Sequence, residues 1–375
     1  MAKASKGGAV MSNLDQRIFV SYGQDPIPMV QGLLEAMNLG ASIPSGSRIG
    51  LKPNLVVARP AHGGATTEPK VVEGVIQYLQ ACGFGDLIIM EGSWVGDSTA
   101  RAFQVCGYAD LAEKYGVDLV DLQKDGFHSR KVEELELSIC NAMNEIDYLI
   151  NFPVLKGHCQ TKITCALKNL KGCIPNAEKR RFHTLGLHKP IAYLNKALKT
   201  DLVIVDGLFG DLDFEEGGNP VQMDRIIVGQ DPVLVDSYVA HLLGYEPEEI
   251  PHICLAAELG VGNIYGQSNE VVVLNTKHTM SRIKPTRQVD DLARFVREDQ
   301  ACSACYGSLI HALGRLRERR LLHRIPKTIV IGQGFQGKKG SELGIGSCTR
   351  GFDSHAAGCP PTGKAILDFL HKNLE

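Results

Sequence analysis

Four cysteines in the last fifth of the chain have the residue type and spacing of metal ligands. Two residues separate Cys302 from Cys305; Gly346 lies two positions before Cys348, and Gly358 directly precedes Cys359. Two thiolates at that separation can face the same ion or cluster, and a preceding glycine lets the backbone turn closely around it. Thiolates are soft ligands that suit zinc and iron–sulfur clusters. We therefore expect these cysteines to form one metal centre.

The sequence around the last cysteine favours a 4Fe-4S cluster over zinc. Cys359 is followed by Pro360, and a cysteine followed by proline ends many cluster-binding motifs. Structural zinc sites commonly use two close cysteine pairs, whereas ten residues separate Cys348 from Cys359. A 4Fe-4S cluster is thus the expected cofactor, with zinc as the alternative. The non-metal interpretation is a set of unpaired structural cysteines.

A segment free of acidic residues, 148–177, is the second group with chemical potential, because it carries several lysines. Thr161, Thr164, Lys168 and Lys171 have helical spacing, which predicts a helix with one cationic, hydroxyl-bearing face opposite an apolar face. A solvated helix usually mixes glutamates among its lysines. We therefore expect this face to bind a carboxylate or phosphate, with a merely solvated face as the alternative.

Three histidines lie in or after this segment, and a histidine beside lysines can act as an acid or base near neutral pH. His158 is the strongest candidate because it follows the end of an expected strand. Lys156 can act as a base or anchor an anion. For His158, His183 and His188 alike, a structural hydrogen-bonded role is the competing interpretation.

Polar residues also follow several expected strands. In open α/β sheets, ligands bind beyond the carboxyl ends of the strands, so such residues converge on one crevice if the strands are parallel neighbours. The expected catalytic residues are Lys156, His158, Glu91 and Asp206, and the expected substrate-binding residues are Lys52, Asn54, Thr164, Lys168 and Lys171.

The elements that must position these residues alternate along the chain. Runs rich in β-branched residues predict strands at 17–22, 48–52, 87–91, 118–121, 148–152, 202–206 and 225–229. Helical apolar spacing predicts helices at 28–38, 69–82, 98–106, 191–198 and 233–243. This alternation indicates an α/β fold in which a mostly parallel sheet is flanked by helices.

Changes in composition divide the chain. We expect a disordered leader over 1–14, an α/β domain over 15–265 and a small C-terminal four-cysteine iron–sulfur module over 285–375, after a polar linker. Within the module we expect a strand at 328–331 and a final helix at 363–374.

A glycine-dense loop in this module resembles a phosphate-binding loop. Gly332–Lys338 matches the first seven positions of that motif, but Lys339 stands where serine or threonine is required, and no helical pattern follows directly. We interpret the stretch as a loop that wraps the metal centre.

Charge and hydropathy narrow the function. Forty basic and 42 acidic residues leave a net charge of −2, so the electrostatic footprint of a nucleic-acid binder is missing. No stretch approaches the roughly 20 apolar residues that span a bilayer. We expect a cytoplasmic protein with no nucleic-acid or membrane partner.

The motifs together resemble the uncharacterised family known as domain of unknown function 362. The matching segments are Leu51–Asn54, Thr67–Pro69, Glu91–Gly92, Asn151–His158, Thr164–Gly172, Val205–Gly207 and Gly229–Pro232. The resemblance implies the α/β architecture, and it implies iron rather than zinc because many relatives carry an iron–sulfur module. Those relatives often have three cysteines in a tight run, whereas 42 residues separate Cys305 from Cys348 here.

Three functions are compatible with these features. The first is an iron–sulfur redox enzyme or electron-transfer protein that acts on an anionic small molecule, a carboxylate or phosphate, or on an electron-transfer partner. The second is a non-redox isomerase or lyase of a carboxylic acid with a structural cluster. The third is a zinc-stabilised interaction module.

Overall fold

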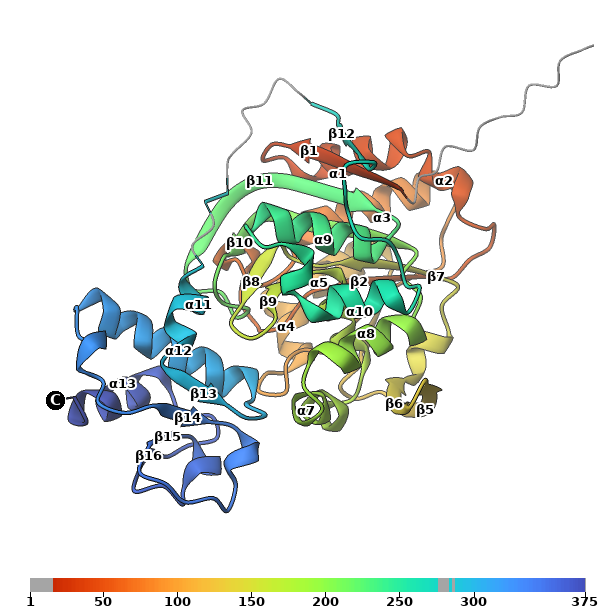
Figure 1. The fold of residues 1–375 in the computed structure, drawn as a ribbon. Coiled ribbons are helices and arrows are strands. Elements are labelled where there is room, and N and C mark those ends of the chain that lie inside the picture. Colours follow the sequence, from red (N-terminus) through yellow and green to blue (C-terminus); the bar gives the residue numbers. More distant parts are fainter. Residues whose placement is uncertain (1–15, 276–282, 285–286, 375) are drawn as a thin grey trace, which may run out of the picture.

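The computed structural model describes residues 16–275, 283–284 and 287–374, so the expected leader over 1–14 lies outside the described residues. A large sheet forms the centre of the body (Figure 1). Its strand order is β12-β1-β11-β10-β7-β2-β3-β4. Its strands are β1 (Arg17–Tyr22), β2 (Ile49–Pro53), β3 (Leu87–Glu91), β4 (Asp118–Asp121), β7 (Tyr148–Phe152), β10 (Leu202–Asp211), β11 (Pro220–Gly229) and β12 (Glu270–Val273). Only β11 runs antiparallel to its neighbours, so the sheet is mostly parallel, as predicted.

Helices cover both faces of this sheet. One face carries α1 (Pro26–Ala36), α2 (Leu39–Ser42), α3 (Pro69–Ala81), α4 (Thr99–Val105) and α5 (Tyr108–Tyr115). The other carries α6 (Ala166–Asn169), α7 (Asn176–Thr184), α8 (His188–Ala197), α9 (Pro232–Leu242) and α10 (Pro251–Glu258). Successive side chains of a strand point to opposite faces. Val203 and Val205 accordingly enter one core, while Leu202 and Ile204 enter the other.

Two hairpins extend from the body. They are β5 (Phe127–Val132) with β6 (Leu135–Cys140), and β8 (Lys156–His158) with β9 (Lys162–Thr164). The prediction of one helix with Thr161, Thr164, Lys168 and Lys171 on the same face is therefore wrong, because Thr164 lies in strand β9. The chain turns through Lys162, which has a positive φ of 64°, and becomes helical only at Ala166.

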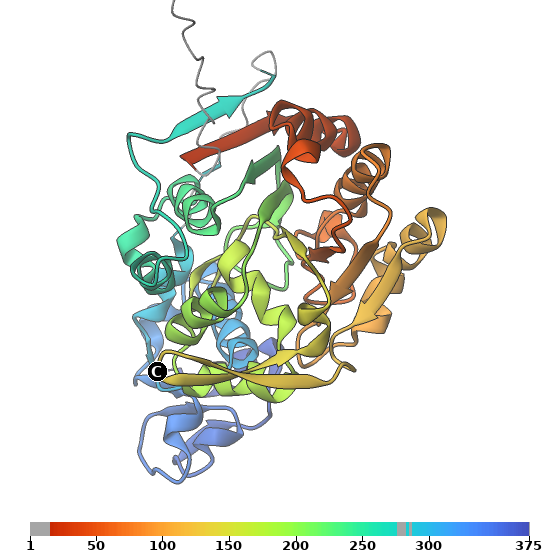
Figure 2. The ribbon, with the colours of Figure 1, turned by 90° about the vertical axis from the view of Figure 1, so that its right-hand side faces the viewer.

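The C-terminal part forms a module with its own parallel sheet and core. Its strands are β13 (Val296–Glu298), β14 (Ile329–Ile331), β15 (Leu343–Ile345) and β16 (Ser354–Ala356), and its helices are α11 (Gln288–Ala293), α12 (Ser303–Glu318) and α13 (Gly363–Lys372). The module lies beside one end of the body, drawn in blue at the bottom of Figure 2.

Contacts from two loops of the body join the module to it. Gln160 donates to the carbonyl of Ala301 and accepts from Ser303, over 3.0 and 2.7 Å. Phe214, in the loop between β10 and β11, packs into the module's core with its ring edge toward His311. In the described part of the chain, no helix combines the length and apolar character needed to cross a bilayer.

Candidate functional site

A cavity of about 460 Å³ has walls from both the body and the module. The module contributes all of the predicted metal-binding cysteines: Cys302, Cys305, Cys348 and Cys359. The body contributes a wall of basic side chains, namely Lys168, Lys171, Lys179, Arg180 and His183. The two groups that the sequence singled out thus face one space.

The module's elements explain why cysteines distant in sequence meet. Cys302 precedes α12 and Cys305 lies in its first turn, while Cys348 and Cys359 follow the neighbouring parallel strands β15 and β16. The two loops that follow these strands are joined by a hydrogen bond from Ser347 N to Gly358 O of 2.8 Å. Parallel strands that end at the same edge bring their loops together.

Gly346 lies beside the thiols in a backbone conformation that favours glycine. It has a positive φ of 85°, which would strain any other residue. A Cβ placed there would lie 3.8 Å from the sulfur of Cys305, in ordinary van der Waals contact.

The thiols are close enough to oppose one another's ionisation. Burial, followed by the nearby Cys348 and Cys359, raises the pKa of Cys302. Burial and the other three cysteines raise the pKa of Cys305 to about 12. Among the described residues, no group of three or more His, Cys, Asp or Glu side chains is placed to hold a single metal ion.

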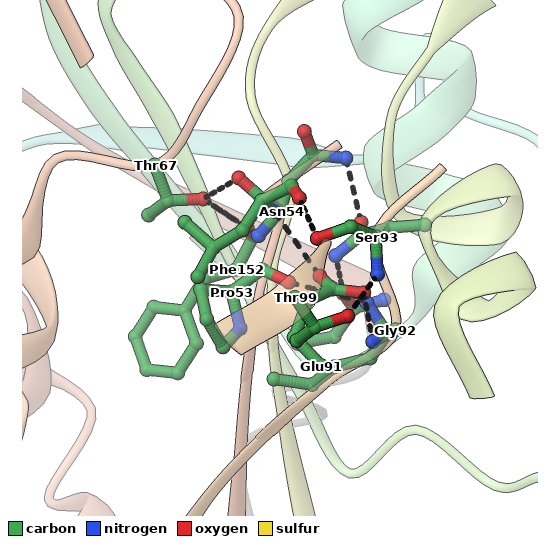
Figure 3. Close-up of polar contacts among 12 residues, drawn as sticks. Pro53, Asn54, Thr67, Glu91, Gly92, Ser93, Thr99 and Phe152 are labelled. Carbon is green, nitrogen blue, oxygen red and sulfur yellow. Dashed lines mark hydrogen bonds and ion pairs between the residues drawn. The ribbon is translucent and has the colours of Figure 1, made fainter. Parts of the chain in front are cut away.

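On the body side, the ends of β2, β3 and β7 are tied together by buried polar contacts (Figure 3). Thr67 Oγ1 accepts from Asn54 N and donates to Phe152 O, each over 2.8 Å. Glu91 accepts from the backbone of Leu55 and Gly92 and pairs with Lys52 over 3.0 Å. These contacts hold Asn54 and Glu91 at the cavity edge.

Several predicted site residues are instead enclosed in the body. Lys156 donates to Asn54 Oδ1, Ala65 O and Glu215 O, so its three donors are all used; burial lowers its pKa to about 8. Asp206 accepts from the backbone of Glu68 and Leu208, and burial raises its pKa to about 7. Of the residues expected to meet in the crevice, Lys52, Lys156, His158, Asp206 and Thr164 do not line the cavity.

A buried triad links the cavity to the hairpin β8–β9. Lys168 Nζ lies 2.5 Å from Glu215 Oε1, and His158 Nε2 lies 3.1 Å from Glu215 Oε2, although its N–H does not point straight at that oxygen. Nδ1 of His158 accepts from the backbone of Gln160 and Thr161, which assigns the ring proton to Nε2. Burial, followed by Lys168, lowers the pKa of His158 to about 4, so the ring is neutral at pH 7.

Glu215 is ionised in this triad. Burial alone would favour the neutral acid, but Lys168 and His158 hold the pKa of Glu215 well below its usual value. Lys168 sits where it does because Asp236 of α9 accepts from Ala166 N and Leu167 N, which fixes the start of α6. The cation that the sequence predicted as a substrate ligand is therefore already paired.

Lys171 differs from Lys168. It lines the cavity and has neither a hydrogen-bond nor an ion-pair partner anywhere in the described chain. Burial, followed by Lys168, lowers its pKa to about 7. Arg180 at the cavity edge is likewise without a partner among described residues, and the buried Nδ1 of His183 has none either. These are the side chains left to meet a ligand.

The comparisons with known proteins agree with the body's motifs. The family model of the domain of unknown function DUF362 matches residues 49–241. The chain belongs to this family. A curated relative, a thylakoid-associated protein of Synechocystis sp., is 27% identical over 241 residues, which cover 61% of this chain and 73% of the relative.

Two solved structures resemble the chain at low TM-score. The lactate racemase apoprotein from Thermoanaerobacterium thermosaccharolyticum has a TM-score of 0.35 and 12% identity, over 56% of this chain and 54% of that one. A protein from Thermotoga maritima has a TM-score of 0.37 and 11% identity, over 63% of this chain and 60% of that one. The chain thus spans little more than half of either structure.

The DUF362 match includes the whole basic wall of the cavity but ends before the module. Lys179, Arg180 and His183 were not among the predicted site residues, although their basic character just after the acid-free segment was an available signal. Glu215 was missed altogether, because a glutamate in a loop more than forty residues after Lys168 carries no local sign of its partner. Lys179 donates to the carbonyls of Gly92 and Ser93, which joins α7 to the loop after β3 in the wall of the cavity.

Proposed function

We propose that this DUF362 protein holds a 4Fe-4S cluster on Cys302, Cys305, Cys348 and Cys359 and acts as an oxidoreductase on a small anion bound beside it. One observation carries the proposal: the four thiols line the same cavity as Lys171 and Arg180, which have no partner among the described residues. Cofactor and substrate would then be in contact within one cavity.

The residues fit such a cluster. Four thiols are the usual donor set for a 4Fe-4S cluster. Gly346 keeps side-chain atoms out of the space beside Cys305.

The position of the cysteines favours a redox role over a structural one. All four line the cavity; Cys359 is exposed and the others are half-buried, rather than lying wholly inside the module's core. A cluster there would supply single electrons to whatever the cavity holds.

The basic wall supports an anionic substrate. Lys171 and Arg180, which have no partner among the described residues, can bind a carboxylate or phosphate. Burial, followed by Lys171 and Lys168, lowers the pKa of His183 to about 2, so its ring is neutral and can form a hydrogen bond to the anion through Nδ1. The cavity of about 460 Å³ must contain both cluster and substrate, and ligand sites for drug-sized molecules alone measure ≈ 300–1,000 Å³. The substrate is therefore small.

Metal analysis of protein purified without oxygen tests the cofactor. We expect iron and acid-labile sulfide in equal amounts, a broad absorption that dithionite bleaches, and a paramagnetic resonance signal from the reduced protein. Serine variants of each of the four cysteines should lose the iron, while Cys82→Ser, at an exposed cysteine outside the cavity, should keep it. Colourless protein with stoichiometric zinc would overturn the proposal.

Turnover assays test the redox role. The cluster-loaded protein should oxidise or reduce a member of a panel of small carboxylates and phosphate esters, with an artificial electron carrier as partner. Turnover that is unchanged when the cluster is held reduced or oxidised would instead assign a non-redox isomerase or lyase with a structural cluster.

A further inference from the structure

The glycine-dense loop after β14, residues 332–338, lies against the cysteines. Gln333, Gly334 and Phe335 form a single 3₁₀ turn, and both Gln333 and Gln336 line the cavity. The sequence of this loop resembles a phosphate-binding motif, but its position calls for another explanation.

Two glycines let the loop pack closely against the segment that follows β13. A Cβ at Gly332 would lie 1.9 Å from Asp299 O, and one at Gly334 would lie 2.0 Å from Asp299 Cγ. Gly334 N donates to Asp299 O over 3.0 Å, and Gln333 N donates to Gln300 O over 3.1 Å. The turn is thereby held in one position.

The turn places the side-chain amides of Gln333 and Gln336 within hydrogen-bonding distance of two cysteine sulfurs. Gln333 Nε2 lies 3.6 Å from Cys302 Sγ, and Gln336 Nε2 lies 3.5 Å from Cys348 Sγ. Side chains three residues apart on a 3₁₀ turn project in the same direction, which explains the spacing of the glutamines. The described residues show no equivalent side-chain donor for Cys305 or Cys359.

The same geometry argues against phosphate binding by this loop. Lys338, which would face the phosphate, lies 3.4 Å from Asp299 Oδ2 and over the ring of Phe335. The helical turn is one turn long, so it lacks the array of free N–H groups that a helix N-terminus offers to phosphate.

Given the cluster proposed above, we propose that Gln333 and Gln336 raise its reduction potential by donating N–H···S hydrogen bonds to Cys302 and Cys348. Reduction adds negative charge that is shared with the sulfurs, and a donated hydrogen bond stabilises the more negative state. The glutamines are positioning residues that make the cluster easier to reduce.

Methionine variants test this role, because methionine has similar length and no N–H donor. In cluster-loaded Gln333→Met and Gln336→Met, the midpoint potential should fall, and it should fall further in the double variant. Gln104→Met, at an exposed glutamine on α4 outside the cavity, should keep the wild-type potential. Potentials equal to the wild type in all loaded variants would overturn the inference.

A second readout separates hydrogen bonding from simple structural support. Transfer of the wild type to D₂O should shift the iron–sulfur stretching bands in resonance Raman spectra, and the shift should shrink in each variant. Glutamate variants at both positions keep the side-chain shape while removing the donor, and their potentials should fall more. If every variant loses its iron, the glutamines are structural and the inference fails. A wild type without iron would instead refute the cluster itself.

Discussion

The two walls of the cavity are built on different principles. The body wall rests on charged and polar groups that satisfy one another inside the chain, as in Lys52 with Glu91 and Lys168 with Glu215. The module wall carries the four thiols, and burial together with neighbouring cysteines raises the pKa of Cys302 and Cys305. Among the described residues, the side chains that donate to these thiols are the amides of Gln333 and Gln336. The body wall thus owes its stability to internal pairing, whereas we attribute the thiols of the module wall to a soft metal centre.

Replacing one of the four cysteines should have the largest effect, the loss of bound iron. Mutating a residue that hydrogen-bonds to a metal ligand typically lowers metal affinity by roughly 10–100-fold. Cys305→Ser removes a ligand itself, so we expect it to lower iron affinity by more than that. Iron analysis after gel filtration measures the loss, with Cys254→Ser as the matched control outside the cavity. If the Cys305 variant kept all of its iron, the module wall would not be the metal-binding site that we propose.

Breaking the fully buried pair of the body wall should have the next largest effect. Lys52 and Glu91 are 0% and 3% exposed, so Glu91→Gln leaves a buried ammonium without its counter-charge and should cost about 3–5 kcal/mol of unfolding free energy. Urea denaturation measures the cost. The double variant Lys52→Met with Glu91→Leu should recover part of it, and no recovery would indicate that the pair acts through its backbone contacts.

Glu215→Gln should cost less, because its carboxylate is 16% exposed, and its effect should depend on pH. Since the pKa of Glu215 is depressed on folding, its stabilising contribution is fully present above the ordinary glutamate value of 4.5 and is lost as pH falls through the lower folded pKa. The difference in unfolding free energy between wild type and variant should therefore shrink in acid. Glu113→Gln, at an exposed glutamate, should show no such difference.

The smallest expected effect separates two lysines that look alike in sequence. Lys171→Met should weaken binding of inorganic phosphate and small carboxylates at least about tenfold, since a hydrogen bond to a charged group contributes about 1.5–3 kcal/mol. It should not lower stability, because this buried ammonium has no partner among the described residues and burial lowers its pKa. Lys168→Met should mainly lower stability, because it leaves Glu215 without its closest cation. Calorimetric titration and urea denaturation of both variants measure the contrast, and equal effects would contradict it.

Local patterns predicted much of the scaffold. The strands at 87–91, 118–121 and 148–152 were predicted with their observed ends, because apolar or β-branched runs between turn residues specify them. The α/β class and the five helices expected in the body followed from such patterns, whereas the family was inferred from the motifs. The polar linker expected between the two domains lies partly outside the described residues, and β12 shows that the body's sheet extends to Val273.

Long-range contacts explain where prediction failed. The helix expected through Thr161 and Thr164 gave way to a hairpin, and Asp236, seventy residues from Ala166, determines where helix begins. Lys156 and His158 follow β7 but do not line the cavity, because Asn54, Ala65 and Glu215 hold Lys156 and Glu215 also pairs with His158. The spacing of neighbouring residues in the sequence cannot predict contacts between residues that lie far apart in it.

By itself, the sequence determined which residues can do chemistry: cysteines at ligand spacing, and an acid-free segment rich in lysine and histidine. Only the tertiary structure decided that both groups share one cavity, that Lys168 is paired with Glu215, and that Lys171 has no partner among the residues described. The physical reason is that residue type and local spacing are encoded in neighbouring positions, whereas charge compensation depends on side chains that the fold brings from distant ones.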